Sequence, residues 1–342
     1  MTTSTRMYIE AASASKIVAE QLFRNEALVE DIAKQLRERQ PHVIVTCARG
    51  SSDHAATYAK YLIETYAGTP TASFAPSVSS VYAAKQNMSG AVFLALSQSG
   101  ASPDLLASVT AAKDAGALVI ALVNVENSPL AELAHKVIPL HAGPETSVAA
   151  TKSYIATLTA LAHLVAAWTD SDKLRKALAA LPGQLQEAWG LDWQPAVDAL
   201  EAATNFFVIG RGVGLGIAQE AALKFKETAG LHAESYSAAE VRHGPMAIVD
   251  RGFPVLLFTQ DDGTRAGVDD VVEDFASRGA VVIVAGKSYD NTVNLPSLDG
   301  VAAATAPIVF IQSFYKMVNA LAVKRGYDPD SPPHLRKVTE TL

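Results

Sequence analysis

The sequence lacks the features that mark secreted, membrane-spanning and nucleic-acid-binding proteins. Its single cysteine, Cys47, excludes a disulfide framework and a cysteine zinc site, and we expect it to be a small buried residue at a strand end. No apolar stretch of about 18 residues is free of polar breaks, and the N-terminus has no continuous apolar core, so neither a membrane span nor a signal peptide is expected. No run of basic residues interrupts the net charge of −7, which argues against a nucleic-acid partner.

What the sequence contains is enough apolar material for two compact domains. Of its 342 residues, 49% are hydrophobic and 18% are charged, which is typical of a folded protein and not of a disordered chain. This length allows two domains, each large enough to bury a core of its own. We therefore expect a soluble, cytoplasmic protein with two domains.

The chain carries one pattern twice, about 162 residues apart. Gly50 maps onto Gly212 and Gln98 maps onto Gln260 with the same offset, and each of these residues follows a short apolar run. A constant offset at two separate strand ends indicates a duplicated α/β unit.

Short runs rich in Val, Ile and Leu alternate with helical patterns, which indicates parallel sheets covered by helices on both faces. Strands are expected at 42–47, 71–75, 91–96, 117–123 and 137–141, and again at 205–209, 232–236, 254–259 and 281–285. Helices are expected at 7–40, 53–65, 102–115, 128–134, 147–169 and 306–324, with a short one from Ser77 and two helical linker stretches around Pro182-Gly183. The proline-rich segment 327–333 cannot be helical and should form an extended strap.

The two copies differ in chemistry where ligands bind in such sheets, beyond the carboxyl ends of the strands. In the first copy, hydroxyls, an amide and a glycine precede Pro103, which suits the first position of a helix. Free N–H groups at a helix start, together with hydroxyls, form a phosphate cradle, although a capped turn with locally bonded serines has the same composition. In the second copy, Asp261 and Asp262 would repel an anion. The expected cradle comprises Ser97, Gln98, Ser99 and Ser102, joined in one crevice by Ser51 and Ser52.

These motifs resemble the sugar isomerase (SIS) domain family, and more closely the isomerase half of glucosamine-6-phosphate synthase. The resemblance covers essentially the whole chain. The glutaminase half of that enzyme needs an N-terminal cysteine nucleophile and has no counterpart here, so we expect similarity to the free-standing isomerising glucosamine-6-phosphate deaminases. The motifs that carry the resemblance are Gly210-Arg211-Gly212, Glu220 to Glu227, His232-Ala233-Glu234, Glu240 to Pro245, and Pro333 to Thr339.

The resemblance implies an α/β fold of two tandem flavodoxin-like SIS domains, each a parallel sheet flanked by helices, followed by an extended C-terminal tail. It implies an N-terminal helical segment at 1–24 and a first SIS domain with the phosphosugar site at 25–175. A second SIS domain with the catalytic helix and the dimer contact follows at 190–326, and a tail that closes the active site at 327–342.

The resemblance also implies roles for individual residues. Glu227 falls on the general base, and Lys224 on another active-site lysine. His243 falls on the ring-opening histidine, which is donated across a homodimer interface, and Lys337 on the tail lysine that meets the sugar carbonyl. Ser52, Ser97, Gln98, Ser99 and Ser102 would hold the phosphate and nearby hydroxyls, and Val148 and Ala150 would line the sugar, with Ala150 standing where the synthase usually has a serine.

The chemistry supports these residue types independently. Interconversion of an amino-aldose and a ketose moves a proton between C1 and C2, which one carboxylate can take and return. Opening the sugar ring needs an acid–base group near neutral pH, which suits histidine, and an enolamine intermediate favours a nearby lysine. The same row of Glu220, Lys224 and Glu227 is also typical of a solvated helix face. No metal or cofactor is required.

The expected substrate is a hexosamine 6-phosphate, namely glucosamine 6-phosphate. The expected reaction converts it, together with water, into fructose 6-phosphate and ammonia. The alternatives are a deglycase, a galactosamine-6-phosphate deaminase or an aldose–ketose isomerase without deamination. A phosphosugar sensor would carry a DNA-reading helix pair before this fold. The 40 residues before the first expected strand are too few and too weakly basic for such a pair. The remaining alternative is an ammonia-dependent synthase subunit. The glycines at 210–216 lack the dinucleotide-binding spacing, since Leu215 stands where the third glycine belongs, and His232, Glu234 and His243 fit no common metal spacing.

Overall fold

The computed structural model describes residues 4–337, which form two compact units that each contain one parallel sheet. We call residues 16–145, 153–179 and 336–337 the first lobe, and residues 4–15, 146–152 and 180–335 the second lobe. The chain thus enters the second lobe three times. Three helices have residues in both lobes: α2 (Ala14–Arg39), α8 (Asp172–Gly190) and, by its first residue alone, α7 (Lys152–Trp168).

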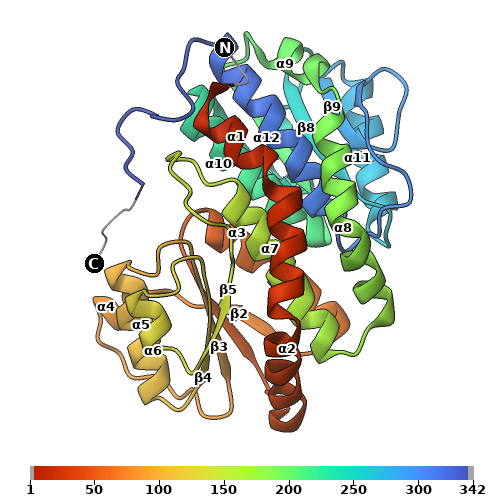
Figure 1. The fold of residues 1–342 in the computed structure, drawn as a ribbon. Coiled ribbons are helices and arrows are strands. Elements are labelled where there is room, and N and C mark those ends of the chain that lie inside the picture. Colours follow the sequence, from red (N-terminus) through yellow and green to blue (C-terminus); the bar gives the residue numbers. More distant parts are fainter. Residues whose placement is uncertain (1–3, 338–342) are drawn as a thin grey trace. The chain divides into compact units, whose positions relative to one another are not determined.

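The sheet of the first lobe has five parallel strands in the order β2-β1-β3-β4-β5, which is the flavodoxin-like order. Figure 1 shows α5 and α6 on one side of this sheet and α2 and α7 on the other. The strands are β1 (Ile44–Cys47), β2 (Thr71–Ser73), β3 (Val92–Ser97), β4 (Leu118–Val123) and β5 (Lys136–Pro139). The helices besides α2 are α3 (Ser51–Tyr66), α4 (Ser77–Ser80), α5 (Pro103–Asp114), α6 (Pro129–Leu133) and α7 (Lys152–Trp168).

The central strands of the first sheet are buried on both faces, as their unbroken apolar sequences predict. Every residue of β1 and β3 is buried. On one face, alternate strand residues such as Phe93 and Val119 pack against Leu105 and Val109 of α5. This packing fixes the place where β3 ends and α5 begins.

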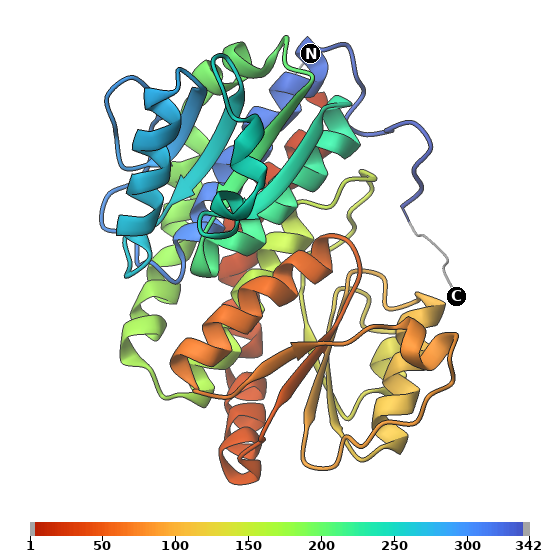
Figure 2. The ribbon, with the colours of Figure 1, turned by 180° about the vertical axis from the view of Figure 1, so that it is seen from behind.

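The second lobe repeats the same strand order, as β7-β6-β8-β9-β10. In the reverse view of Figure 2, α10 and α11 lie on opposite sides of this sheet. The strands are β6 (Asn205–Gly210), β7 (His232–Ser237), β8 (Pro254–Thr259), β9 (Val281–Gly286) and β10 (Val293–Leu295). The helices are α1 (Arg6–Ala12), α9 (Gln194–Leu200), α10 (Leu215–Ala229), α11 (Arg265–Ser277) and α12 (Ala306–Lys324), with 3-10 turns η2 (Gly212–Gly214), η3 (Glu240–His243) and η4 (Pro245–Ile248).

The predicted duplication is confirmed down to individual backbone positions. The strands β3 and β8 and the helices α5 and α11 begin at positions related by the offset found in the sequence. Gly50 and Gly212 both adopt left-handed backbone, with φ of 55° and 57°. A residue with a side chain would be strained there, which explains why the glycine recurs in both copies.

Three local expectations need correction. The helix expected from Ser147 begins at Lys152, so the residues between them form a loop. The helix expected over 7–40 is interrupted at Ser13, and the linker helix α8 continues through Pro182. The short strand β10 and the helix α11 were not expected.

The most apolar helix of the second lobe, α12, is a core helix. It is long and apolar enough to cross a membrane by composition, but 83% of its most apolar window is buried inside the fold. Core helices of soluble proteins can be equally long and apolar. The burial of α12 therefore favours a core helix over a membrane-spanning one.

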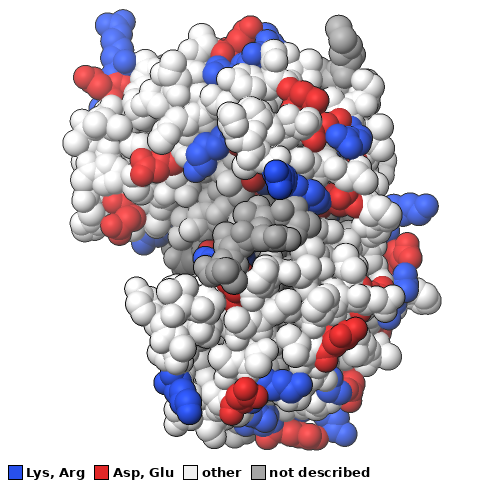
Figure 3. All heavy atoms as spheres, turned by 90° about the vertical axis from the view of Figure 1, so that its left-hand side faces the viewer, with Lys and Arg blue, Asp and Glu red and all other residues white. Residues whose placement is uncertain are grey.

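Acidic and basic side chains are interspersed over the surface. On the face that Figure 3 shows, they alternate among uncharged residues and form no broad patch of one sign. This distribution matches the absence of basic runs in the sequence.

Candidate active site

The predicted phosphate cradle is a tight loop between β3 and α5. Ser97, the last residue of β3, is buried, and its Oγ accepts a hydrogen bond of 2.9 Å from the N–H of Gly100. Gly100 has a φ of 65°, and a Cβ there would lie 2.2 Å from the Oγ of Ser128. Only glycine fits this turn, which leaves Gln98 and Ser99 partly exposed at the edge of the sheet.

An ion pair fixes the start of α5 beneath this loop. Nε and Nη2 of Arg49 donate to Oδ2 of Asp104 at 2.8 and 2.7 Å. The Asp104 side chain is fully buried, whereas that of Arg49 is 54% exposed. The pair therefore joins the end of β1 to the first turn of α5 and leaves part of a guanidinium facing solvent near the cradle.

The second pair of predicted serines follows the neighbouring strand. Ser51 and Ser52 begin α3 directly after Gly50 and are half-buried. Because β1 and β3 pair in parallel, their following loops share the carboxyl edge of the sheet. Ser102 occupies the predicted N-cap position of α5, but its side chain makes no capping hydrogen bond. The structure thus gathers the six predicted phosphate-binding residues of the first lobe along one edge.

The equivalent loop in the second lobe is held by its own side chains. Gln260 is 3% exposed, and its Nε2 donates to the carbonyl of Arg211 at 2.6 Å and to Oδ2 of Asp262 at 3.2 Å. The same carboxylate accepts hydrogen bonds from the backbone N–H and the hydroxyl of Thr264. The glutamine that is partly exposed in the first copy therefore fills the space between loops in the second.

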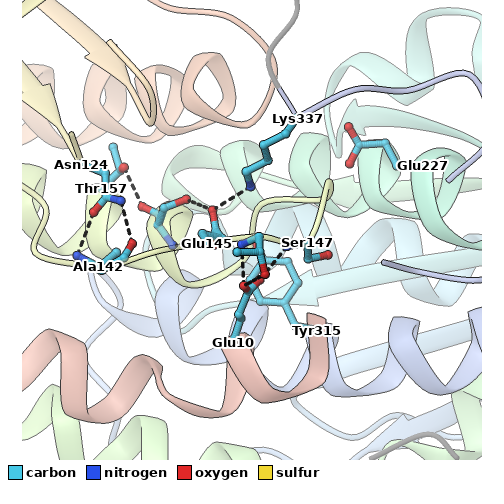
Figure 4. A network of polar contacts seen from close by, with 12 residues as sticks. Glu10, Asn124, Ala142, Glu145, Ser147, Thr157, Glu227, Tyr315 and Lys337 are labelled. Atoms are coloured by element: carbon cyan, nitrogen blue, oxygen red, sulfur yellow. Dashed lines mark hydrogen bonds and ion pairs between the residues drawn. The ribbon is translucent and has the colours of Figure 1, made fainter. Parts of the chain in front are cut away.

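The loop that carries Val148 and Ala150 belongs to the second lobe and is held by a carboxylate from α1. Glu10, which is 9% exposed, accepts hydrogen bonds from the backbone N–H groups of Thr146 and Ser147 at 2.6 and 3.2 Å. Figure 4 shows Glu10 directed at this loop. These bonds hold the segment out of the helix that was expected there. Val148 and Ala150 are half-buried.

A second carboxylate explains where α7 begins and where the tail lysine lies. Glu145 accepts hydrogen bonds from the backbone N–H of Ser153 at 3.1 Å and from its hydroxyl at 2.5 Å, which caps the helix. Nζ of Lys337 lies 3.3 Å from Oε2 of the same carboxylate, whose side chain is fully buried (Figure 4). Lys337 therefore already has a carboxylate partner within the first lobe. Val338 and the residues after it lie outside the described residues.

The predicted catalytic helix, α10, carries a row of charges at its inner face. Nζ of Lys224 lies 3.2 Å from Glu220 and 2.5 Å from Glu227, and the lysine side chain is 1% exposed. Glu220 also accepts a hydrogen bond of 3.1 Å from the hydroxyl of Tyr315 on α12. Burial alone lowers the pKa of Lys224, but the two carboxylates outweigh it and hold this pKa above its usual value. The lysine is therefore a cation at neutral pH.

The remaining predicted catalytic residue, His243, does not belong to this row of α10. It ends the 3-10 turn η3 and is exposed. Within the described residues it neither hydrogen-bonds nor pairs with Glu227, whose side chain is 21% exposed. The second lobe thus contains the predicted site residues Val148, Ala150, Lys224, Glu227 and His243. The first lobe contains the cradle and Lys337.

Sequence reasoning missed four residues that hold the predicted ones in place. Asp104 is the buried partner of Arg49, and Glu145 is that of Lys337. Glu10 binds the backbone of residues 146–147, and Tyr315 binds Glu220. A weak signal existed for Asp104, because an acidic residue in the first turn of a helix beside a strand-end arginine is available for pairing. For the other three, the partners are too distant in sequence to be recognised.

Two parallel sheets of the same order, each ending in a ligand-type loop, define a tandem SIS-domain architecture. The SIS domain family profile matches residues 37–167 and 199–323, and the chain belongs to this family. It is homologous to the isomerase domain of glucosamine-6-phosphate synthase. Glutamine–fructose-6-phosphate aminotransferase (isomerizing) of Methanothermobacter thermautotrophicus is 34% identical over 320 residues, which are 90% of this chain and 52% of that protein. The chain thus spans about half the length of such curated relatives.

Solved structures agree with this assignment. A candidate phosphosugar isomerase from Silicibacter pomeroyi is 44% identical, with a TM-score of 0.91 over 95% of this chain and 100% of that one. The C-terminal domain of glucosamine-fructose-6-phosphate aminotransferase from Francisella tularensis is 27% identical, with a TM-score of 0.88 over 96% of this chain and 98% of that one. The two-sheet fold of this chain is therefore that of SIS-type phosphosugar isomerases.

Proposed function

We propose that this protein catalyses the isomerising deamination of glucosamine 6-phosphate to fructose 6-phosphate and ammonia. The observation that carries the proposal is the row of charges on α10, where buried Lys224 orients the partly exposed carboxylate of Glu227. A proton shuttle needs a carboxylate that is held in place but reachable by substrate, and Glu227 meets both conditions. The homology to isomerising aminotransferases supports the choice of an amino sugar phosphate.

The cradle between β3 and α5 would bind the phosphate. Its serine hydroxyls, the N–H groups at the start of α5 and the exposed part of Arg49 supply donors and positive charge. The ion pair of Arg49 with the buried Asp104 keeps these donors in place before substrate arrives. Val148 and Ala150 would line the sugar in this proposal.

Three further groups complete the proposed cycle. His243 opens the sugar ring, and its exposure suits donation across the interface of a homodimer. Glu227 moves the proton between C1 and C2, and Lys337 acts at the carbonyl carbon from which ammonia leaves. Water is the other substrate, and we place the reaction in the cytoplasm.

Replacement of Glu227 tests the proposal. Glu227→Gln should keep sugar-phosphate binding and lose turnover by about 100-fold or more, because the amide cannot take the proton. Ammonia and ketose release from glucosamine 6-phosphate measures turnover, and calorimetry measures binding. Glu273→Gln, at an exposed position on α11, is the matched control. Undiminished ammonia release by Glu227→Gln would remove the carboxylate from the mechanism.

The second candidate function is a related reaction on another phosphosugar, favoured by Ala150. This residue removes one hydroxyl from the proposed sugar-lining loop, so the contacts that select an epimer differ from those of the synthase. A parallel assay with galactosamine 6-phosphate, and one with fructose 6-phosphate alone, separates a deaminase of the other epimer and a simple isomerase from the proposed activity.

A further inference from the structure

A cavity lies in the second lobe beside the β8–α11 loop, and Gln260 and Asp261 are among the residues that line it. It has a volume of about 470 Å³ and is bounded by the carboxyl ends of β8 and β9, the loop 297–301 and the first turns of α12. This volume lies in the range of small-molecule sites. None of the predicted site residues lines it.

Two basic side chains, Arg265 and Lys287, line this cavity. Arg265, at the start of α11, has a side chain that is 20% exposed, and its guanidinium interacts with Asp261 and with the hydroxyl of Tyr289. Its Nε and Nη1 are buried and make no hydrogen bond within residues 4–337. The other cation of the cavity, Lys287, is already 2.8 Å from Asp269. Buried donors without a partner are rare and destabilising, so the guanidinium is suited to receive an anionic group.

The rim of the cavity carries the opposite charge. The side chain of Asp261 is 92% exposed and lies 3.7 Å from Nη2 of Arg265, and Asp299 on the facing loop is also exposed. Between rim and interior, Leu298, Val309 and Phe310 form an apolar wall. A ligand that matched the cavity would carry an anionic group inward, a cationic group outward and carbon between them.

We propose that this cavity binds a small zwitterion, with its acidic group at Arg265 and its ammonium at Asp261 and Asp299. Amino sugar phosphates and apolar α-amino acids share this chemistry. The site is independent of the proposed reaction, because it is built only from second-lobe residues that take no part in it.

Binding stoichiometry tests the proposal. Titration calorimetry is performed on the full chain carrying Glu227→Gln, which suppresses the proposed turnover. If the zwitterion is an amino sugar phosphate, glucosamine 6-phosphate binds twice per chain and glucose 6-phosphate, which lacks the ammonium, binds once. If it is an amino acid, L-leucine binds once, and glucosamine, which lacks the anionic group, does not bind at this site.

Variants assign the second binding event to the cavity. Arg265→Gln should weaken it by at least about tenfold, as the loss of a charge-assisted hydrogen bond predicts, and Asp261→Asn should weaken it without risk to folding because the side chain is exposed. Arg278→Gln, near the other end of α11, is the matched control and should leave it unchanged. Single binding of glucosamine 6-phosphate together with no binding of L-leucine would overturn the proposal, as would a second event that survives both cavity variants. Ammonia release by the unmodified chain is measured separately and reports on the proposed reaction alone. Calorimetry reports on the cavity, so failure of one can be distinguished from failure of the other.

Discussion

One buried carboxylate, Glu145, connects the start of a helix to the tail lysine. Its two oxygens are shared between Ser153 and Lys337, and its side chain is fully buried. The lysine is therefore positioned by a residue that need not touch substrate. Because Lys337 is a proposed catalytic group, the position of its ammonium should depend on this carboxylate.

The substitution Glu145→Gln should lower kcat by about tenfold to 100-fold with a smaller change in KM, because a misplaced catalytic group loses rate more than ground-state binding. Steady-state kinetics measures both constants. Ser153→Ala removes the helix-capping contact but leaves the carboxylate beside Lys337. Equal losses in the two variants would show that only the helix cap matters.

The only thiol provides a second test at the scale of one residue. Burial raises the pKa of Cys47 to about 12, so the thiol stays protonated at pH 8. We expect no modification of the native protein by a thiol-reactive disulfide at this pH, and one modified thiol per chain in denaturant. Fast stoichiometric labelling of the native chain would contradict the burial of this side chain.

The residues that could be predicted from sequence are those whose role depends on their neighbours in the chain. Hydroxyls, a glycine and a proline in one short segment predict the turn and the start of α5, because both are local structures. Phosphate binding by this loop stays a prediction. Asp104, Glu10 and Glu145 could not be predicted, because their partners lie 55, 136 and 192 residues away. Nothing in a single sequence assigns such buried pairs.

At the scale of elements, α10 combines stability with proposed catalysis. Lys224 lies between two carboxylates, and Glu220 is also bonded to Tyr315. Since the pKa of Lys224 is held above its usual value, its contribution to stability is complete below the ordinary lysine pKa and is lost only as pH rises through the higher one. Its charge is therefore constant across the neutral range.

We expect Lys224→Met to lower the free energy of unfolding by about 3–5 kcal/mol, because the fully buried carboxylate of Glu220 loses its cation. Urea unfolding measures the change. Adding Glu220→Gln removes the stranded charge and should recover part of the loss. If the single variant is as stable as the unmodified chain, the two groups are not paired in the native protein.

The start of α7 shows why an element boundary was misplaced. Residues 147–151 are small, β-branched or hydroxyl-bearing, and their pattern continues that of the helix. The carboxylates of Glu10 and Glu145 override this local preference by binding backbone N–H groups on either side of the segment. Tertiary hydrogen bonds of this kind decide helix ends that propensity leaves open.

At the scale of the whole molecule, the proposed sharing of His243 between subunits has a direct test. Glu227→Gln and His243→Asn chains are each expected to be inactive. Mixed after reversible dissociation, they should regain about a quarter of wild-type activity, because half of the dimers are mixed and each contains one site with both groups intact. Ammonia release from the mixture measures the recovery.

Two outcomes would count against this arrangement. No recovery, with mixed dimers demonstrated by differently tagged chains, would place both groups in the same subunit. A monomer by light scattering would remove the interface altogether.

The equal length of the two ligand-end loops has a consequence for protein engineering. Both run from the last residue of a strand to the residue before a helix, with no insertion in either copy. A chimera in which residues 97–102 replace 259–264 would therefore need no change in chain length, and the transplant would bring along the glycine that its left-handed turn requires. The duplicated fold thus allows the proposed phosphate-binding segment to be transferred to the second lobe at constant chain length.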